Sequence, residues 1–420
     1  MTRAAGGSGA GRGLARGAIL ALTVVALLPT SCTARMSDSA PAGQLNGVAD
    51  APSPVSTSPA ALLPTQPEAL RPPLGLSPVA AEARRLVYVP NSMSDTVDVI
   101  DPARYRVIAH FSVGAEPQHV VPAWDLRTLW VNDDRGNSLV PIDPSTGRPG
   151  RPVPVADPYN LYFTPDGAHA LVMAERERRI DVRDPHTMRL QHSIPVPCRG
   201  VNHADFTVDG SWFLASCEFS GRLLVVAGDL SRVLAVIDLN RIRTPGATSP
   251  AHARMMGGPA SSLDPGASSM PQDVRLVPDG RTFLVADMLR NGVWLVDAAT
   301  HRIRGFESTG LGAHGIYPSR DFTRIFVSNR DAGSISVLYG STLRVVTTWR
   351  LPGGGSPDMG GLSLDGSQLW LSGRYNGVVY VISTVDGRLL HRIPVGSGPH
   401  GLCVWPQPGR YSLGHTGTMR

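Results

Sequence analysis

The hydrophobic positions of this chain recur in short runs separated by polar turns, and seven of these runs are versions of one phrase. Each copy is a short run of mainly apolar and β-branched residues, which is typical of a buried strand, and a polar turn and a second apolar run follow most copies. The copies begin at Leu86, Leu129, Ala170, Phe213, Phe283, Ile325 and Leu369. Because no single copy can bury its apolar face alone, the repetition predicts stacked units of one β-rich architecture.

Turn signals precede the copies, most clearly the Asp-Gly pairs at residues 166–167, 209–210, 279–280 and 365–366, and Asp-Gly between apolar runs favours an antiparallel hairpin. Seven landmark residues lie just before these turns, at intervals of 41, 43, 70, 41, 45 and 41 residues: His119, Asn160, His203, Asp273, His314, Met359 and His400. A period near 40 fits a four-stranded propeller blade. The pattern predicts an all-β fold, a single seven-bladed β-propeller with four-stranded antiparallel blades, over residues 84–410. An open β-solenoid is the alternative, which antiparallel hairpins disfavour.

The seventh inner segment, residues 400–405, lies close to the end of the chain. Its expected partner is the first copy of the phrase, near Leu86. The last blade would then be closed by both chain termini, which removes an open sheet edge. Residues 411–420 are left as a C-terminal tail.

The strand pair at residues 87–91 (VYVPN) and 95–101 (DTVDVID), with the connector at residues 393–400 (IPVGSGPH), resembles the YVTN-repeat β-propeller family. The resemblance covers about residues 85–408 and implies the fold. The family includes binding proteins, redox-cofactor proteins and many of unknown role, so the resemblance leaves the function open.

The N-terminal region has the features of an export signal. Arginines precede an apolar run at residues 18–28, which is too short for a stable membrane span. Cys32, in LPTSC, resembles the lipobox cysteine of bacterial lipoproteins, although Pro29 departs from that pattern. We expect a signal peptide over residues 1–32 with a lipid on Cys32, or simple cleavage and secretion. Residues 33–83 are rich in Ala, Pro and Ser and predict a disordered tether, so the propeller is expected on the outer face of the cell membrane or secreted.

Composition excludes several kinds of chemistry. All 39 cationic residues are arginine, so a phosphate-loop lysine, a Schiff-base lysine and Ser-Lys hydrolysis are excluded. The chain has no Cys-x-x-Cys and no Gly-x-Ser-x-Gly motif. The net charge is +5, partly from signal-peptide arginines, and no basic block occurs, so no nucleic-acid partner is expected. We expect a monomer whose partners are the membrane surface and, as an option, another protein.

Folding the hairpin about residues 209–210 brings Cys217 near Cys198. An exported protein meets an oxidising compartment, so this pair is a disulfide candidate, while Cys403 fits a small buried apolar residue.

Histidines dominate the landmark positions, and in a propeller these positions surround one mouth of the central channel. Neutral imidazoles and carboxylates that converge on one axis can bind a transition metal or a haem iron. Propellers of nitrite and nitrous oxide reductases are similar in this use of histidine, but no ligand can be matched to theirs. The metal or ligand candidates are His119, His203, Asp273, His314, Asp358 and His400.

Other interpretations of these histidines stay open. They could pack between blades, or act in acid–base catalysis as part of a redox or lactone-handling enzyme. The protein could also be an interaction scaffold with an empty channel.

The 70-residue interval contains an insertion at about residues 241–269, on the face where the histidines gather. His252, Met255 and Met256 are lid candidates, because long loops on rigid scaffolds often carry function and Met favours soft metals. A disordered insertion or an apolar plug are the alternatives.

Overall fold

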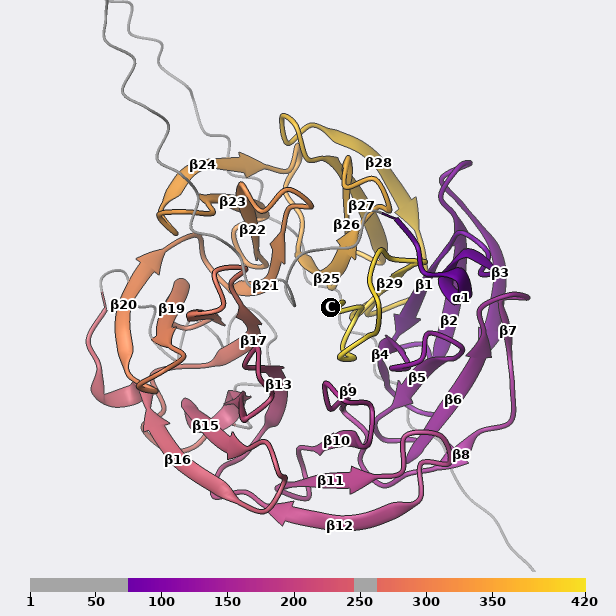
Figure 1. Ribbon diagram of the computed structural model, residues 1–420. Coiled ribbons are helices and arrows are strands. Elements are labelled where there is room, and N and C mark those ends of the chain that lie inside the picture. Colours follow the sequence, from indigo (N-terminus) through magenta and orange to yellow (C-terminus); the bar gives the residue numbers. More distant parts are fainter. Residues whose placement is uncertain (1–74, 245–262) are drawn as a thin grey trace, which may run out of the picture. The chain divides into compact units, whose positions relative to one another are not determined.

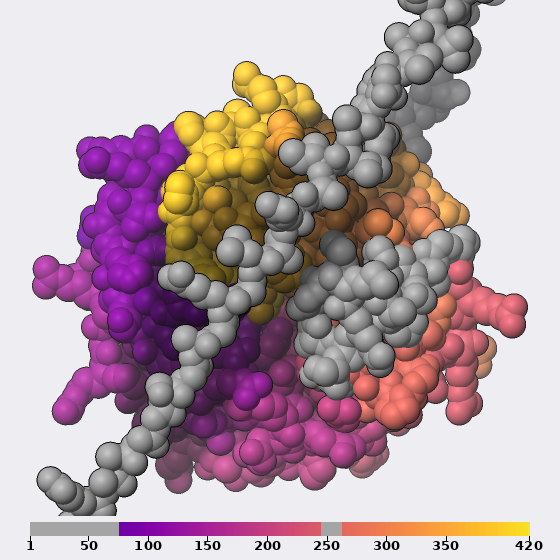
Figure 2. Space-filling view, turned by 180° about the vertical axis from the view of Figure 1, so that it is seen from behind, coloured from indigo at the N-terminus to yellow at the C-terminus, as the bar shows by residue number. Residues whose placement is uncertain are grey.

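The computed structural model describes residues 75–244 and 263–420, and it is a seven-bladed propeller of antiparallel sheets (Figure 1). The predicted fold is therefore confirmed. Seen from the other side, the blades follow one another in chain order around the ring (Figure 2). Within the described ranges, no helix combines the length and the apolar character that crossing a bilayer requires.

The first four blades in chain order comprise the following strands: β29 (Cys403–Trp405), β1 (Leu86–Asn91), β2 (Thr96–Asp101) and β3 (Arg106–Ser112); β4 (Pro117–Pro122), β5 (Leu129–Asp133), β6 (Ser138–Asp143), β7 (Arg148–Pro149) and β8 (Val153–Pro154); β9 (Asn160–Phe163), β10 (Ala170–Ala174), β11 (Arg179–Arg183) and β12 (Leu190–Pro195); β13 (Val201–Phe206), β14 (Trp212–Cys217), β15 (Arg222–Ala227) and β16 (Val233–Asp238).

The last three blades comprise β17 (Pro271–Leu276), β18 (Thr282–Asp287), β19 (Gly292–Asp297) and β20 (Ile303–Ser308); β21 (Ala313–Pro318), β22 (Arg324–Asn329), β23 (Ser334–Tyr339) and β24 (Val345–Arg350); and β25 (Pro357–Leu362), β26 (Gln368–Gly373), β27 (Val378–Ser383) and β28 (Leu389–Pro394). Three short helices accompany them: α1 (Pro78–Ala81), η2 (Glu218–Ser220) and η3 (Leu239–Arg241).

Both ends of the propeller sequence build one blade, as predicted. β29 pairs antiparallel with β1, so that Cys403 lies opposite Tyr88 and Trp405 opposite Leu86. The next blade differs from the others because its outer edge consists of two short strands, β7 and β8, which both pair with β6. This closure gives the first blade its fourth strand and leaves β1 paired on both sides.

The hydrophobic core lies between adjacent blades. In one interface, Leu223 and Trp212 of one blade pack with Phe283 and Trp294 of the next. The inner strand β13 is buried along its whole length, whereas the outermost strand β3 is mostly exposed. Each blade therefore depends on its neighbours for burial, as the repeated phrase implies.

A disulfide joins Cys198 to Cys217, with 6.1 Å between the Cα atoms, and Cys403 is free and buried. Cys198 lies in the connection before β13, and Cys217 ends β14 opposite Val201. The disulfide therefore ties down the start of an inner strand.

After β29 the chain turns back into the centre of the ring, where the C-terminus lies (Figure 1). Residues 409–420 form a hairpin closed by a bridge between Ser412 and Met419, which we call the C-terminal hairpin. His415 donates a backbone hydrogen bond to the Leu161 carbonyl at 2.9 Å, and the Phe163 amide donates to the Leu413 carbonyl at 3.0 Å. These contacts with β9 place residues 411–420, expected only as a tail, inside the channel.

Candidate functional site

Four inner strands, β13, β17, β21 and β25, begin with β-bulges, and in these strands the bulge determines which side chains face the axis. The register shifts before Ala204 in β13, Val274 in β17, Ile316 in β21 and Gly360 in β25. A bulge interrupts the strict alternation of side chains, so neighbouring positions can point the same way. His203 and Asp273 lie directly before the residue at which regular strand pairing resumes, whereas His314 and Asp358 lie two residues before it. All four side chains face the axis.

Four predicted histidines form one buried cluster on the axis. The ring centroid of His119 lies 5.6 Å from that of His203 and 4.8 Å from that of His400. His314 lies 6.3 Å from His203 and 5.9 Å from His400, measured between the same points. All four side chains are buried. The structure thus brings these imidazoles together in the channel and does not place them between blades.

A fifth imidazole, that of His415, completes the cluster and was not among the residues singled out from the sequence. Its ring lies 4.9 Å from His203 and 5.3 Å from His119, and it stacks on Tyr162 at 6.1 Å. The C-terminal hairpin carries it, and glycines 414 and 417 with positive φ flank it. Those glycines signal a turn in the sequence, but nothing in the sequence indicates that the turn enters the channel.

The cluster contains two groups with the composition of a metal site. The inner triad is His203, Asp273 and His415; the outer triad is His314, Asp358 and His400. In each triad one ligand atom per residue lies within 4.8 Å of the others. His119 contacts the rings of both His203 and His415, and that of His400. All six predicted ligand candidates therefore belong to this one cluster.

Many polar atoms of this cluster are buried without a hydrogen-bond partner among the described residues. They are both ring nitrogens of His119, Nε2 of His203 and of His415, Nδ1 of His314 and of His400, Oδ1 of Asp273 and Oδ2 of Asp358. Buried polar atoms are nearly always paired in folded proteins, because desolvation without a partner is costly. Such a concentration of unpaired atoms at one point is typical of a site that can hold an ion or ordered water.

Burial keeps these imidazoles neutral. It lowers the pKa of His119 to about 3 and holds the pKa of the other four histidines well below the ordinary value, with nearby arginines adding to the effect. A neutral imidazole has a free lone pair on one nitrogen, which is the form that binds metals. The cluster can therefore donate nitrogen ligands at neutral pH.

An arginine is paired with each carboxylate of the cluster. The Nε of Arg330 donates to Asp358 at 2.9 Å, and its Nη2 contacts the Nε2 of His314. Arg275 donates to the Oδ2 of Asp273 at 3.2 Å. Burial raises the pKa of Asp273 to about 6, and Arg275 opposes this shift. The Oδ1 of Asp273 stays unpaired and faces His415.

The outer triad lies at the base of a cavity of about 500 Å³ that opens at the channel mouth, and His314 and His400 line it. Its walls carry charges of both signs. They include Glu116, Asp134, Arg176, Arg178, Arg199, Arg330 and Arg374, together with Glu175 and Glu218, whose pKa values burial raises. Asp264, in the described C-terminal part of the predicted insertion, accepts hydrogen bonds from Ser220 at 2.7 Å and from Arg199 at 3.2 Å, and Arg199 lines this cavity.

The family model for the YNCE-like beta-propeller matches residues 56–188 and 265–408, which together make up most of the chain. This chain belongs to the YNCE-like beta-propeller family. The interruption between the matched ranges, residues 189–264, contains most of the insertion. No curated protein matches the sequence.

Solved structures share the fold of this YNCE-like propeller at low sequence identity. A functionally unknown protein from Desulfotomaculum acetoxidans has 15% identity and a TM-score of 0.59, with 77% of this chain and 100% of that chain covered. Dihydro-heme d1 dehydrogenase NirN in complex with DHE has 15% identity and a TM-score of 0.55, covering 80% and 77%. Kuenenia stuttgartiensis hydrazine synthase has 16% identity and a TM-score of 0.55, covering 79% and 99%. At such identities the likeness shows the fold alone.

Four other residues singled out from the sequence lie outside the described residues. They are the lipidation candidate Cys32 and the lid candidates His252, Met255 and Met256.

Proposed function

We propose that this protein is an exported propeller that binds a transition-metal ion in its channel, with the inner triad and His119 as ligands. One observation carries the proposal: five buried, neutral imidazoles face one another, and the nitrogens that point inward have no partner among the described residues. Nitrogen ligands suit zinc and copper, whereas magnesium and calcium prefer oxygen.

The inner triad fits an ion better than the outer one. In the inner triad, Arg275 contacts only the Oδ2 of Asp273, and the atoms that face the shared space are Oδ1 and the Nε2 atoms of His203 and His415. In the outer triad the guanidinium of Arg330 contacts both Asp358 and His314, so a cation would have to compete with it. Three imidazoles and one carboxylate form a donor set that zinc or copper(II) commonly takes.

Export to the outer face of the membrane, with a lipid on Cys32, is part of the proposal. Its support is the signal-like N-terminal sequence and the disulfide between Cys198 and Cys217, since disulfides persist in oxidising compartments. An ion held on an exported domain would be taken from the extracytoplasmic medium, through the mouth cavity.

The test measures metal binding by the whole protein. Protein freed of metal with a chelator is titrated with zinc and with copper(II) at pH 7, and the bound metal is counted by mass spectrometry. We expect one equivalent of tightly bound ion. The His203→Gln/His415→Gln variant should lose affinity by about 100-fold, because two of the nitrogen ligands are gone. His186→Gln is the control, since that side chain is 72% exposed and lies away from the channel.

Two results would overturn the proposal: no saturable binding of either ion, or equal affinity in the wild type and the double variant. Circular dichroism of each variant shows whether a loss of binding comes from a loss of fold.

A further inference from the structure

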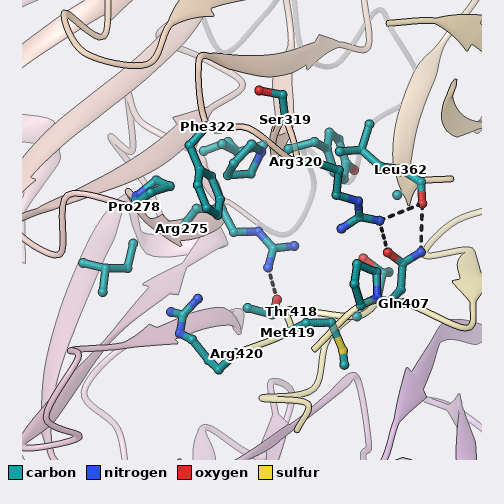
Figure 3. Close-up of a pocket in the computed structure, with 18 of the residues that line it drawn as sticks. Arg275, Pro278, Ser319, Arg320, Phe322, Leu362, Gln407, Thr418, Met419 and Arg420 are labelled. Carbon is teal, nitrogen blue, oxygen red and sulfur yellow. Dashed lines mark hydrogen bonds between the residues drawn. The ribbon is translucent and has the colours of Figure 1, made fainter. Parts of the chain in front are cut away.

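A second cavity, of about 130 Å³, lies at the end of the channel that the C-terminal hairpin closes (Figure 3). Strands β17, β21 and β25 and the segments that follow them form most of its wall, and the hairpin forms the rest. The wall is mixed: Pro278, Ile316, Phe322 and Leu362 supply apolar groups, and Ser319, Gln407 and Thr418 supply polar ones. Three arginines also reach it: Arg275, Arg320 and Arg420.

The positive charges of this cavity are not all balanced. Arg275 pairs with Asp273 at 3.2 Å, and Arg420 pairs with Asp205 at 2.7 Å. Arg320 makes no such pair: none of the described carboxylates lies within 4 Å of its guanidinium nitrogens, in contrast to Arg275 and Arg420. Arg320 therefore has no direct ion pair, and the carboxylate whose charge acts on it, Asp365, lies beyond hydrogen-bond distance.

Arg320 is largely buried and only partly hydrogen-bonded. Its Nη2 donates to the Ser363 carbonyl at 3.0 Å and to the side-chain oxygen of Gln407, whereas its Nε is buried without a partner. Figure 3 shows the guanidinium beside Gln407 and Leu362. Burial lowers the pKa of Arg320 to about 10, which leaves it charged at neutral pH. A buried cation without a direct ion pair is unfavourable, and the open space beside this one can hold an anion.

We propose that this cavity binds a small organic monocarboxylate, with the carboxylate on Arg320 and the apolar body against Phe322 and Leu362. A guanidinium attracts a carboxylate and donates a charge-assisted hydrogen bond to it. The Nη2 of Arg320 already donates to Ser363 and Gln407, so the donors left for a ligand are on its other nitrogens. A phosphate would bring nearly two negative charges to the one arginine of the cavity that lacks a direct ion pair, whereas a monocarboxylate brings one. The size of the cavity favours an acid of a few carbon atoms.

Butyrate is the probe, and butyramide, its neutral isostere, is the ligand control. Both are titrated into the metal-free full-length protein by calorimetry, and the melting temperature is followed in parallel. We expect saturable butyrate binding, a higher melting temperature with butyrate, and neither effect with butyramide. Arg320→Gln should weaken butyrate binding by more than about tenfold, as the loss of a charge-assisted pair implies. Arg344→Gln, at a side chain that is 73% exposed, should bind butyrate as the wild type does.

A second variant keeps the test valid if Arg320→Gln unfolds. Gly361 lines the cavity, and a Cβ built on it would meet only Val404, at 3.8 Å, so Gly361→Leu fills space without removing the arginine. This variant should lose butyrate binding and keep its melting temperature. Equal binding of butyrate and butyramide, or unchanged butyrate affinity in either variant, overturns the proposal. The His203→Gln/His415→Gln variant should still bind butyrate, which separates this site from the metal site.

Discussion

At the scale of single residues, His119 is the imidazole of the cluster that hydrogen bonds orient least. Neither of its ring nitrogens has a hydrogen-bond partner among the described residues, and its ring contacts His203, His400 and His415. Asn160 interacts with Nδ1 of both His203 and His415, so those two rings are oriented by a neighbour and His119 is not. We therefore expect His119 to be a ligand whose ring takes a fixed orientation when an ion binds.

The same residue gives a pH-dependent prediction. Its pKa is about 3 in the folded state because of burial, and near the ordinary 6.5 when unfolded. Between these values the unfolded state binds a proton at His119 and the folded state does not, so acidification destabilises the wild type. His119→Gln lacks this contribution. The free energy of unfolding of the wild type, relative to the variant, should fall by about 2 kcal/mol from pH 7 to pH 5.

Urea unfolding of both metal-free proteins at the two pH values measures this difference. Carboxyl groups with raised pKa values, such as Asp273, act in the opposite direction, but they are present in both proteins and cancel. A difference that stays constant with pH would mean that His119 titrates normally in the folded protein.

At the scale of elements, the disulfide holds the start of β13, where a bulge turns His203 toward the axis. It closes a loop with a sequence separation of 19, for which the chain-entropy estimate is about 3 kcal/mol. Reducing the wild type should lower its free energy of unfolding by about that amount. The free energy of unfolding of the Cys198→Ala/Cys217→Ala variant should not change when reductant is added. Urea unfolding with and without dithiothreitol tests this; a wild type indifferent to reductant contradicts it.

The elements also show how far the sequence predicts the site. Blades can be counted because each central strand, such as β18 or β26, repeats one apolar phrase behind a turn signal. It is harder to predict which inner-strand side chains face the channel axis, because bulges break the two-residue alternation of side chains. His314 and Asp358 reach the axis from a position one residue earlier than His203 and Asp273 do. The landmark positions include four histidines of the cluster and Asp273, whereas Asp358 is the neighbour of a landmark and His415 is not near one. The spacing alone could not show which of these side chains face the axis.

At the scale of the whole molecule, the two ends of the described chain meet where Leu76 bridges Gly409, and the C-terminal hairpin enters the channel (Figure 1). Closure by β29 was predictable, since residues 400–405 carry an inner-strand pattern that lacks a partner. The position of His415 in the channel was not predictable, because residues 411–420 contain neither the repeated phrase nor an alternating pattern. Their place depends on contacts such as Arg420 with Asp205, which arise only once the ring has closed.

The C-terminal hairpin should therefore be dispensable for the blades and necessary for the site. β29 ends at Trp405, so deletion of residues 409–420 leaves seven complete blades. It removes buried Leu413 and the Arg420–Asp205 pair, and we expect the free energy of unfolding to fall by about 2–4 kcal/mol. Strand content by circular dichroism should stay unchanged.

Metal titration of this deletion beside His415→Gln separates the two roles of the hairpin. His415→Gln removes one ligand and keeps the channel closed, so affinity should fall by about tenfold. The deletion removes the same ligand and also admits water to the inner triad, which weakens the electrostatic attraction between Asp273 and the ion. Its affinity should fall further than that of His415→Gln, and its ion should dissociate faster into a chelator. Equal affinities would show that the hairpin supplies a ligand without sealing the site, and wild-type affinity in the deletion would remove His415 from the ligand set.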